Sequence, residues 1–195
     1  MRAPEPSGLP LARVARWALG LAAVAAGVLF GMAALDGERR RDARLVELLA
    51  PDYTGDDRRA PDFTLPDRHG RLFRLSSLRG RTVVLHFWSS DCPPCVRELS
   101  ESLPAFDEIV RSRPDLALVL VTVDRDWDAV AALVPPGLRA PLLFDPERRV
   151  VNGRFGTRLF PETWVIDPRG VLRARFDHTL SWESPVLTEY LSTFR

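Results

Sequence analysis

The only two cysteines of this 195-residue chain lie in one tetrapeptide, Cys92-Pro93-Pro94-Cys95. They follow an apolar run, Thr82 to Trp88, whose length and composition predict a buried strand. Apolar residues recur at helical spacing directly after them, so the pair lies where a strand passes into a helix. At a helix N-terminus, unpaired N–H groups and the helix dipole stabilise a thiolate. The sequence therefore predicts a redox-active dithiol.

Composition indicates one core-bearing domain after an N-terminal segment. The 27 basic residues nearly balance the 26 acidic ones, giving a formal net charge of +1. No long tract of one charge stands out beyond Arg39–Arg41. Nothing in this pattern favours nucleic-acid binding, and we expect no nucleic-acid partner.

The N-terminal segment is predicted to be a membrane anchor, placed at residues 1–36. Its uncharged stretch, residues 17–35, has about the length a helix needs to cross the hydrocarbon core. The alternative is a cleaved signal peptide, with small residues at Gly31-Met32-Ala33, but the apolar stretch is longer than usual for one. Arginines on both sides leave the orientation undecided by charge. Either signal would place the cysteines in an oxidising compartment, where a dithiol needs external electrons to stay reduced.

Beyond the anchor, residues 37–59 are predicted to form a stalk and linker, and residues 60–195 a single α/β domain. Strands are expected at Phe63–Leu65, Leu72–Leu75, Thr82–Trp88, Leu116–Val123, Leu142–Phe144, Thr163–Ile166 and Val171–Phe176. Helices are expected as one long helix from the cysteine pair to Pro114, then at Trp127–Val134 and about Glu183–Phe194, with a helical turn or two at Glu147–Asn152. This alternation predicts a mixed sheet with helices on both faces.

Several motifs occur in a fixed order along residues 60–195: Ala60–Leu65, Leu75–Gly80, Val83–Trp88, Cys92–Cys95, Phe155-Gly156 and Phe160–Asp167. In that order they resemble the membrane-anchored thioredoxin-fold reductases of the TlpA, ResA and DsbE kind. The Pro-Glu-Thr at 161–163 is closest to the DsbE side of that group. The resemblance implies a thioredoxin-like fold, no cofactor, and reduction of protein disulfides, often in cytochrome c maturation. It also implies the bacterial inner membrane, with the domain on the periplasmic side, and a membrane electron donor of the thiol-reductase type.

The chemistry of the pair can be assigned residue by residue. Cys92, before the helix, is expected to attack a client disulfide, and Cys95, in the first turn, to resolve the mixed disulfide. Pro93 and Pro94 suit the first turn, whose N–H groups lack helical partners. The alternatives are a static disulfide or half a zinc site. Zinc would need two more ligands from the three histidines or from carboxylates, and we predict no metal.

Two further site residues come from the resemblance. It implies a cis-proline at Pro161, lying against the cysteine pair, so that the backbone of Phe160 can pair with a client peptide. It also implies that Glu98 is a proton-handling group, and a semi-buried carboxyl could take the proton of the resolving thiol. The alternative for Glu98 is an exposed helix carboxylate. The family often has proline where this chain has Ser100, which leaves the local helix bend open.

Other residues are expected around the site. His86 occupies the strand position where thioredoxin keeps a buried acid, so it either relays a proton or tunes Cys95, or it is a satisfied core or half-core histidine. Asp91, where the family commonly has Trp, should raise the pKa of the thiol and oppose anionic partners, unless it is an N-cap or turn residue. Trp88 is expected to pack near the site, and Trp182 to form a surface wall.

Two other functions are weighed against disulfide reduction. Thiol peroxidases of the peroxiredoxin class resemble one another in a Pro and a Thr ahead of the reactive Cys, where this chain has Leu85 and Trp88–Asp91. A Sco-like copper chaperone would hold metal on two thiolates and a distant histidine such as His178. Those proteins space their cysteines by three residues, so both alternatives are disfavoured.

Overall fold

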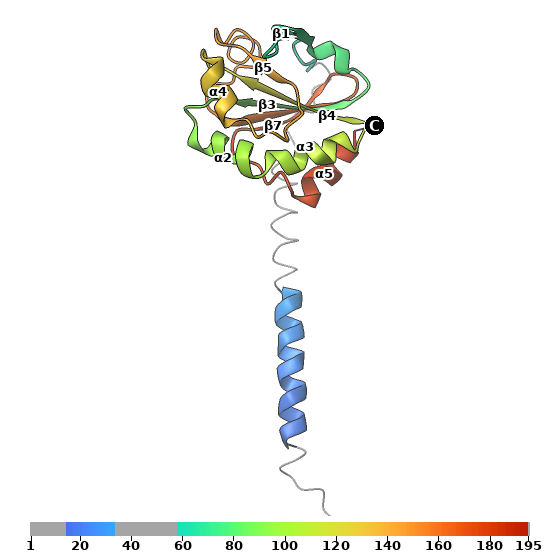
Figure 1. Ribbon diagram of the computed structural model, residues 1–195. Coiled ribbons are helices and arrows are strands. Elements are labelled where there is room, and N and C mark those ends of the chain that lie inside the picture. Colours follow the sequence, from blue (N-terminus) through green and yellow to red (C-terminus); the bar gives the residue numbers. More distant parts are fainter. Residues whose placement is uncertain (1–14, 34–57, 195) are drawn as a thin grey trace, which may run out of the picture. The chain divides into compact units, whose positions relative to one another are not determined.

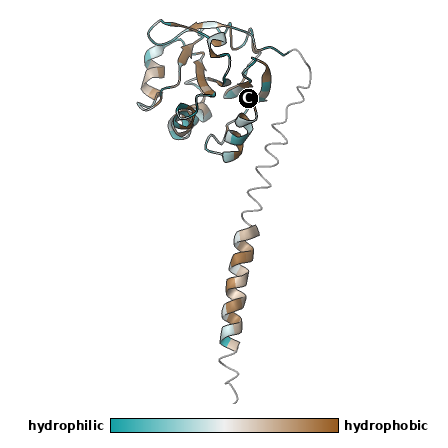
Figure 2. Cartoon of the chain, turned by 90° about the vertical axis from the view of Figure 1, so that its right-hand side faces the viewer, coloured by the Kyte–Doolittle hydropathy of each residue, from teal (hydrophilic) through white to brown (hydrophobic). Residues whose placement is uncertain are grey.

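The computed structural model describes residues 15–33 and 58–194, which belong to two separate compact units. The first unit contains the helix Ala15–Ala33, which is long and apolar enough to cross a membrane. Figure 2 shows apolar residues along this helix. The predicted stalk and most of the predicted linker, residues 37–57, lie outside the described residues.

The second unit is built on a five-stranded sheet of order β5-β4-β3-β6-β7. The strands are β3 (Thr82–Trp88), β4 (Leu116–Thr122), β5 (Leu142–Phe144), β6 (Glu162–Ile166) and β7 (Leu172–Phe176). β3, β4 and β5 run parallel, whereas β6 and β7 are antiparallel to their neighbours. Every residue of β3 is buried, as its apolar character on both faces predicts. The mixed sheet expected from the sequence is thereby confirmed.

The α-helices of this unit cover one face of this sheet, and a 3-10 helix lies over the other. The α-helices are α2 (Pro93–Glu101), α3 (Leu103–Arg111), α4 (Trp127–Leu133) and α5 (Pro185–Ser192). Figure 1 shows α2, α3 and α5 along one side of the sheet. Their apolar residues form one core with the side chains on that face of β3, among them Val84 and Trp88.

The other face is covered by shorter elements. A hairpin of β1 (Thr64–Pro66) and β2 (Leu72–Arg74) leads into the 3-10 helix η1 (Leu75–Leu78). Together with the segment that includes Val150–Phe155, they pack on Leu85 and Phe87 of β3 in a second core. The two cores enclose β3, and a loop of three residues, Ser89–Asp91, joins β3 to Cys92.

Three predicted helices differ from the observed ones. The single long helix is wrong, because the chain breaks at Ser102 into α2 and α3. Pro104 lies in the first turn of α3, where its ring and missing N–H would disrupt a continuous helix. Residues 147–152 form turns without a regular helix, one of them closed by a hydrogen bond from the Asn152 N–H to the Arg148 carbonyl, and the last helix begins at Pro185, two residues later than expected.

Candidate active site

The cysteine pair lies at the carboxyl end of β3, where the chain enters α2. Cys92 is the N-cap of α2, and its Sγ accepts a hydrogen bond from the N–H of Cys95 at 3.3 Å. The two sulfurs form a disulfide, with Cα atoms 5.2 Å apart. Cys92 is half-buried, whereas Cys95 is fully buried. Pro93 and Pro94 occupy the first turn of α2, as predicted, where a missing N–H costs little.

Asp124 anchors the loop that leads to Cys92. Oδ1 of its carboxylate accepts hydrogen bonds from the hydroxyls of Ser90 (2.8 Å) and Ser89 (3.1 Å). Oδ2 accepts from the Ser90 N–H (2.9 Å) and from the Thr122 hydroxyl. Nothing in the sequence analysis singled out this residue. The available signal was its place just after β4, since the carboxyl ends of neighbouring parallel strands meet at one edge of a sheet.

The peptide bond between Phe160 and Pro161 is cis, as the resemblance implied. Pro161 is buried and directly precedes β6, whose first residue, Glu162, pairs with Phe87 near the end of β3. The cis-proline therefore lies at the same edge of the sheet as the cysteine loop. Phe160 is half-buried, and the guanidinium of Arg148 lies 5.8 Å from the centre of its ring.

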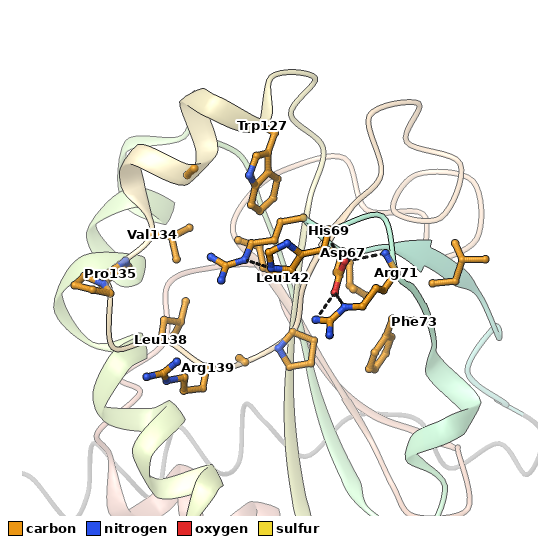
Figure 3. A pocket seen from close by; sticks show the side chains of 17 residues that line it. Asp67, His69, Arg71, Phe73, Trp127, Val134, Pro135, Leu138, Arg139 and Leu142 are labelled. Atoms are coloured by element: carbon orange, nitrogen blue, oxygen red, sulfur yellow. Dashed lines mark hydrogen bonds and ion pairs between the residues drawn. The ribbon is translucent and has the colours of Figure 1, made fainter.

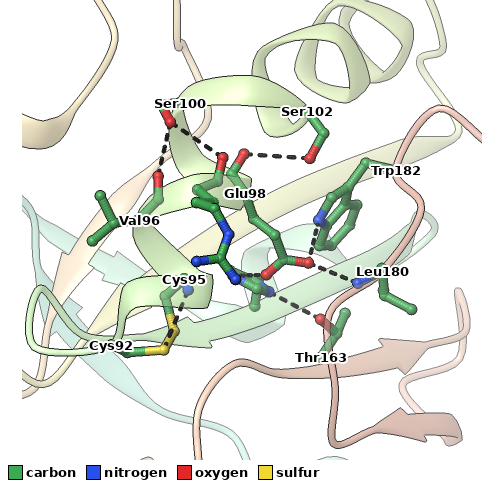
Figure 4. Close-up of polar contacts among 11 residues, drawn as sticks. Cys92, Cys95, Val96, Glu98, Ser100, Ser102, Thr163, Leu180 and Trp182 are labelled. Atoms are coloured by element: carbon green, nitrogen blue, oxygen red, sulfur yellow. Dashed lines mark hydrogen bonds and ion pairs between the residues drawn. A yellow bond between two sulfur atoms is a disulfide. The ribbon is translucent and has the colours of Figure 1, made fainter.

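Glu98 lies on α2 and is only 5% exposed. Its Oε1 accepts hydrogen bonds from the Leu180 N–H at 2.7 Å and from the Trp182 Nε1–H at 2.9 Å (Figure 4). Burial raises the pKa of Glu98, although these two hydrogen bonds and the nearby His178 act in the opposite direction. Of the two readings considered from the sequence, the exposed helix carboxylate is wrong.

His86 is buried on β3, on the face that packs against the helices. Its Nδ1 lies 2.9 Å from the hydroxyl of Thr163, and its ring meets the ring of Trp182 edge-on. Its Nε2 lies 3.9 Å from Oε2 of Glu98. Burial lowers the pKa of His86 to about 3, so the imidazole is neutral and this contact is not an ion pair.

The remaining predicted residues occupy distinct positions. Asp91 is exposed in the turn before Cys92, and the N-cap role considered for it belongs to Cys92 itself. Trp88 is buried in the helix-side core, as expected. Trp182 is fully buried, so the surface wall expected there is wrong. Its indole bonds to Glu98, which explains why an aromatic residue near the chain's end contributes to the site.

Two of the hollows on the second unit differ in their relation to the site. A cavity of about 620 Å³ adjoins the cysteine loop and is lined by Ser89–Asp91, Asp124 and Arg148, among others. A cavity of about 590 Å³ lies between the β1–β2 turn, α4 and β5, where Arg71, Trp127 and Leu142 line it (Figure 3). None of the predicted site residues lines this second cavity.

Metal ligands do not gather in the part of the chain that the structure describes. Within residues 15–33 and 58–194, no group of three or more His, Cys, Asp or Glu side chains is placed to hold an ion. His178, the candidate third ligand of a copper site, is exposed and lies 3.4 Å from the carboxylate of Asp177.

Comparison with known proteins agrees with this geometry. The thioredoxin-like protein YneN of Bacillus subtilis is 28% identical over 100 residues, covering 49% of this chain and 55% of that protein. The thiol-disulfide oxidoreductase ResA of Geobacillus thermodenitrificans is 32% identical over 108 residues, covering 54% and 59%. The chain thus spans about half the length of the curated relatives it matches.

Solved structures show the same fold. A thiol:disulfide interchange protein DsbE from Chlorobium tepidum matches with a TM-score of 0.58 at 23% identity, covering 69% of this chain and 94% of that one. The exposed lipoprotein thioredoxin Etrx1 of Streptococcus pneumoniae matches with a TM-score of 0.57 at 25% identity, covering 68% and 99%. The predicted thioredoxin-like fold is therefore confirmed.

A family model extends this likeness over most of the folded domain. The model of the AhpC/TSA family matches residues 57–175, which include the strand before the cysteine pair, the pair itself and the cis-proline. With the thioredoxin-like fold and the ResA-type relatives, this match over more than half of the sequence shows that the chain belongs to the AhpC/TSA family.

Proposed function

We propose that this chain is a thiol-disulfide oxidoreductase that reduces protein disulfides through Cys92 and Cys95. One observation carries the proposal: a half-buried cysteine at the start of a helix is bonded to a fully buried cysteine in its first turn. This asymmetry suits a sulfur that meets clients and a sulfur that only meets its neighbour. The ResA relatives, which are named thiol-disulfide oxidoreductases, support the same chemistry.

The reaction begins from the reduced pair. The Cys92 thiolate attacks one sulfur of the client disulfide, and the other client sulfur leaves as a thiolate. Cys95 then gives its proton to a base, for which we propose Glu98, and attacks the sulfur of Cys92. The bond between Cys92 and the client breaks, and a second client thiolate leaves. Two electrons pass to the client, and the Cys92–Cys95 disulfide remains.

We propose that the client binds at the edge of the sheet beside Cys92. The backbone of Phe160, before the cis-Pro161, would pair with an extended client segment through main-chain hydrogen bonds. The 620 Å³ cavity next to Asp91 offers room for client side chains. Apocytochrome c, which the family resemblance implies, is one proposed client.

We propose that the helix Ala15–Ala33 anchors the protein in the bacterial inner membrane, with residues 60–195 on the periplasmic side. In that compartment the Cys92–Cys95 pair is oxidised after each turnover and must be reduced again. A membrane thiol reductase is the proposed electron donor. Each reaction oxidises both cysteines of this chain, so the chain has no further thiol that could reduce them again.

The assignment of the two cysteines is tested by single variants of the full chain. Cys92→Ser should abolish reduction of insulin disulfides, because the remaining thiol, Cys95, is fully buried and cannot meet a client disulfide. Cys95→Ser should accumulate mixed disulfides with clients, which a non-reducing gel with client identification detects. Ser100→Ala, an exposed change on the same helix that leaves both thiols in place, is the matched control. Full activity in both cysteine variants would contradict the mechanism.

The direction of electron flow is tested by the reduction potential of the pair. The full chain is equilibrated against dithiothreitol or glutathione buffers, and the reduced fraction is measured by thiol alkylation. A potential near or below that of thioredoxin, about −270 mV, fits a reductant. A potential near that of DsbA, about −120 mV, would identify an oxidant and overturn the proposed direction.

A further inference from the structure

Two buried polar atoms face each other beside the cysteine pair. Among the described residues, Nε2 of His86 and Oε2 of Glu98 are both buried and both lack a hydrogen-bond partner. The same atoms lie 3.9 Å apart, across the contact between β3 and α2. A buried polar atom without a partner is costly, and such atoms in a native structure call for an explanation. Here the two atoms without partners face each other, which suggests that they interact.

Thr163 decides which hydrogen His86 can offer. Its hydroxyl lies 2.9 Å from Nδ1 and can either donate to that nitrogen or accept from it. If the hydroxyl donates, the imidazole carries its hydrogen on Nε2, which then faces the carboxylate. If it accepts, a lone pair on Nε2 faces the carboxylate oxygen. The first arrangement is attractive and the second repulsive, so an ionised Glu98 selects the Nε2–H tautomer.

None of the other groups described around Glu98 donates a hydrogen bond to its Oε2. Leu180 and Trp182 both donate to Oε1, the opposite oxygen of the carboxylate. His178 acts only through its charge, since it is exposed and close to Asp177. Cys95 lies one turn earlier on the same helix. Oε2 is thus the oxygen left to receive a proton, and His86 is the polar group that faces it.

We propose that His86 is a positioning residue that presents its Nε2–H to Oε2 of Glu98 and so keeps this carboxylate ready to accept the thiol proton of Cys95. The proton passes from Sγ of Cys95 to Oε2 while the Cys92–Cys95 bond forms and the bond from Cys92 to the client breaks. His86 gains and loses no proton in this step. The catalytic consequence rests on the proposed reductase function, whereas the contact itself does not.

The contact is tested first without any activity measurement. In the oxidised full chain in detergent, neither cysteine titrates. The carboxyl carbon resonance assigned to Glu98 then reports the titration of Glu98 without a contribution from the thiols. His86→Leu should raise the pKa of Glu98 by about one unit, because the ionised form loses more than the neutral form when a donor is removed. Nitrogen shifts of wild-type His86 should show a neutral ring with hydrogen on Nε2. An unchanged Glu98 titration, or hydrogen on Nδ1, would overturn the proposal.

Thr163→Val provides a second variant in case His86→Leu does not fold. It removes the hydroxyl that holds Nδ1 and should also raise the pKa of Glu98. The matched control is Thr82→Val, which removes a buried hydroxyl from β3 that bonds to the carbonyl of Phe194 instead. The control should leave the Glu98 titration unchanged. An equal shift in both threonine variants would mean a general loosening of the sheet and would refute the specific role.

The catalytic consequence is tested by the pH dependence of disulfide reduction. The acid limb of the rate profile should move to higher pH by about one unit in His86→Leu, with about a tenfold loss on that limb. In a Glu98→Gln background the same change should have no further effect. An additive loss would contradict action through Glu98. If the wild-type chain reduced no disulfide at all, the proposed function would fail, while the NMR titration would still decide the contact.

Discussion

At the scale of single residues, Asp124 connects β4 with the loop that carries Cys92. Its carboxylate accepts from Ser89, Ser90 and Thr122. We expect Asp124→Asn to lower the free energy of unfolding by about 1–3 kcal/mol. Its NH₂ group would replace one carboxylate oxygen and would face N–H and O–H groups that also donate, so their hydrogen bonds would be lost. The loosened loop should also slow disulfide reduction. Urea unfolding, followed by tryptophan fluorescence, and the insulin assay measure the two effects.

The control for this variant is Asp126→Asn. Asp126 is exposed and caps α4 by accepting from the N–H of Asp128, so the same chemical change is made two residues further along. Asparagine is as good an N-cap as aspartate, and little loss is expected. Equal losses of activity in the two variants would show that Asp124 does not position the cysteine loop.

The sequence predicted the residues whose chemistry is tied to a motif, and missed those whose role depends on tertiary contact. Cys92 and Cys95 could be assigned from spacing and position alone. His86 and Glu98 were both singled out, but their contact joins a strand to a helix and no local pattern encodes it. Trp182 was misplaced for the same reason, because its partner lies 84 positions earlier in the chain.

At the scale of elements, the β6–β7 hairpin depends on Asp167. Its carboxylate is buried and accepts from the N–H groups of Arg169 and Val171 and from the guanidinium of Arg173. Burial alone would raise the pKa of Asp167, but the hydrogen bonds from Val171 and Arg173 and the charge of Arg173 outweigh it and lower the pKa. Asp167→Asn should therefore cost about 1–3 kcal/mol of stability at neutral pH.

The pH dependence of this loss follows from the direction of the shift. A carboxyl with a lowered folded-state pKa contributes its stabilisation fully above its unfolded pKa, about 3.9, and loses it as the pH falls through the folded value. The difference between wild type and Asp167→Asn should thus be constant above about pH 5 and shrink toward about pH 3. Urea unfolding at several pH values measures it. The exposed Asp177→Asn is the control, and a constant difference down to about pH 3 would refute the assigned role.

Elements with one dominant signal were predicted well, and elements with competing signals were not. β3 matched its predicted bounds because all seven residues are buried between two covering layers. The helix after the cysteines carried a continuous apolar stripe, yet Pro104 interrupts its backbone at Ser102. Periodicity indicates which side chains are buried, but it does not indicate where a proline interrupts the helical backbone. Residues 147–152 form turns around one buried pair, Val150 and Val151, which is too short a pattern to fix a helix.

At the scale of the whole molecule, the chain joins an apolar helix to a domain whose two cysteines are its only thiols. The ordered motifs predicted the domain's fold, since they lie on successive elements, among them the strands β3 and β6, the 3-10 helix η1 and the start of α2. The boundary between anchor and stalk stays a prediction, because it falls in residues 34–57, outside those described. The proposed periplasmic location is a matter of chemistry and of the family resemblance, because the arginines on the two sides of the apolar helix are balanced.

The location is therefore best tested with the cysteines themselves. In spheroplasts of a bacterium expressing the full chain, a membrane-impermeant reductant followed by an impermeant maleimide should label Cys92 and Cys95 without lysis. The reason is that a periplasmic domain meets both reagents, whereas a cytoplasmic one is shielded by the bilayer. The Cys92→Ser/Cys95→Ser double variant is the control for background.

A retained anchor should keep the labelled protein in the membrane pellet after an alkaline wash, and a cleaved signal should release it at a smaller mass. Labelling only after lysis would place the domain in the cytoplasm and remove the need for a membrane electron donor.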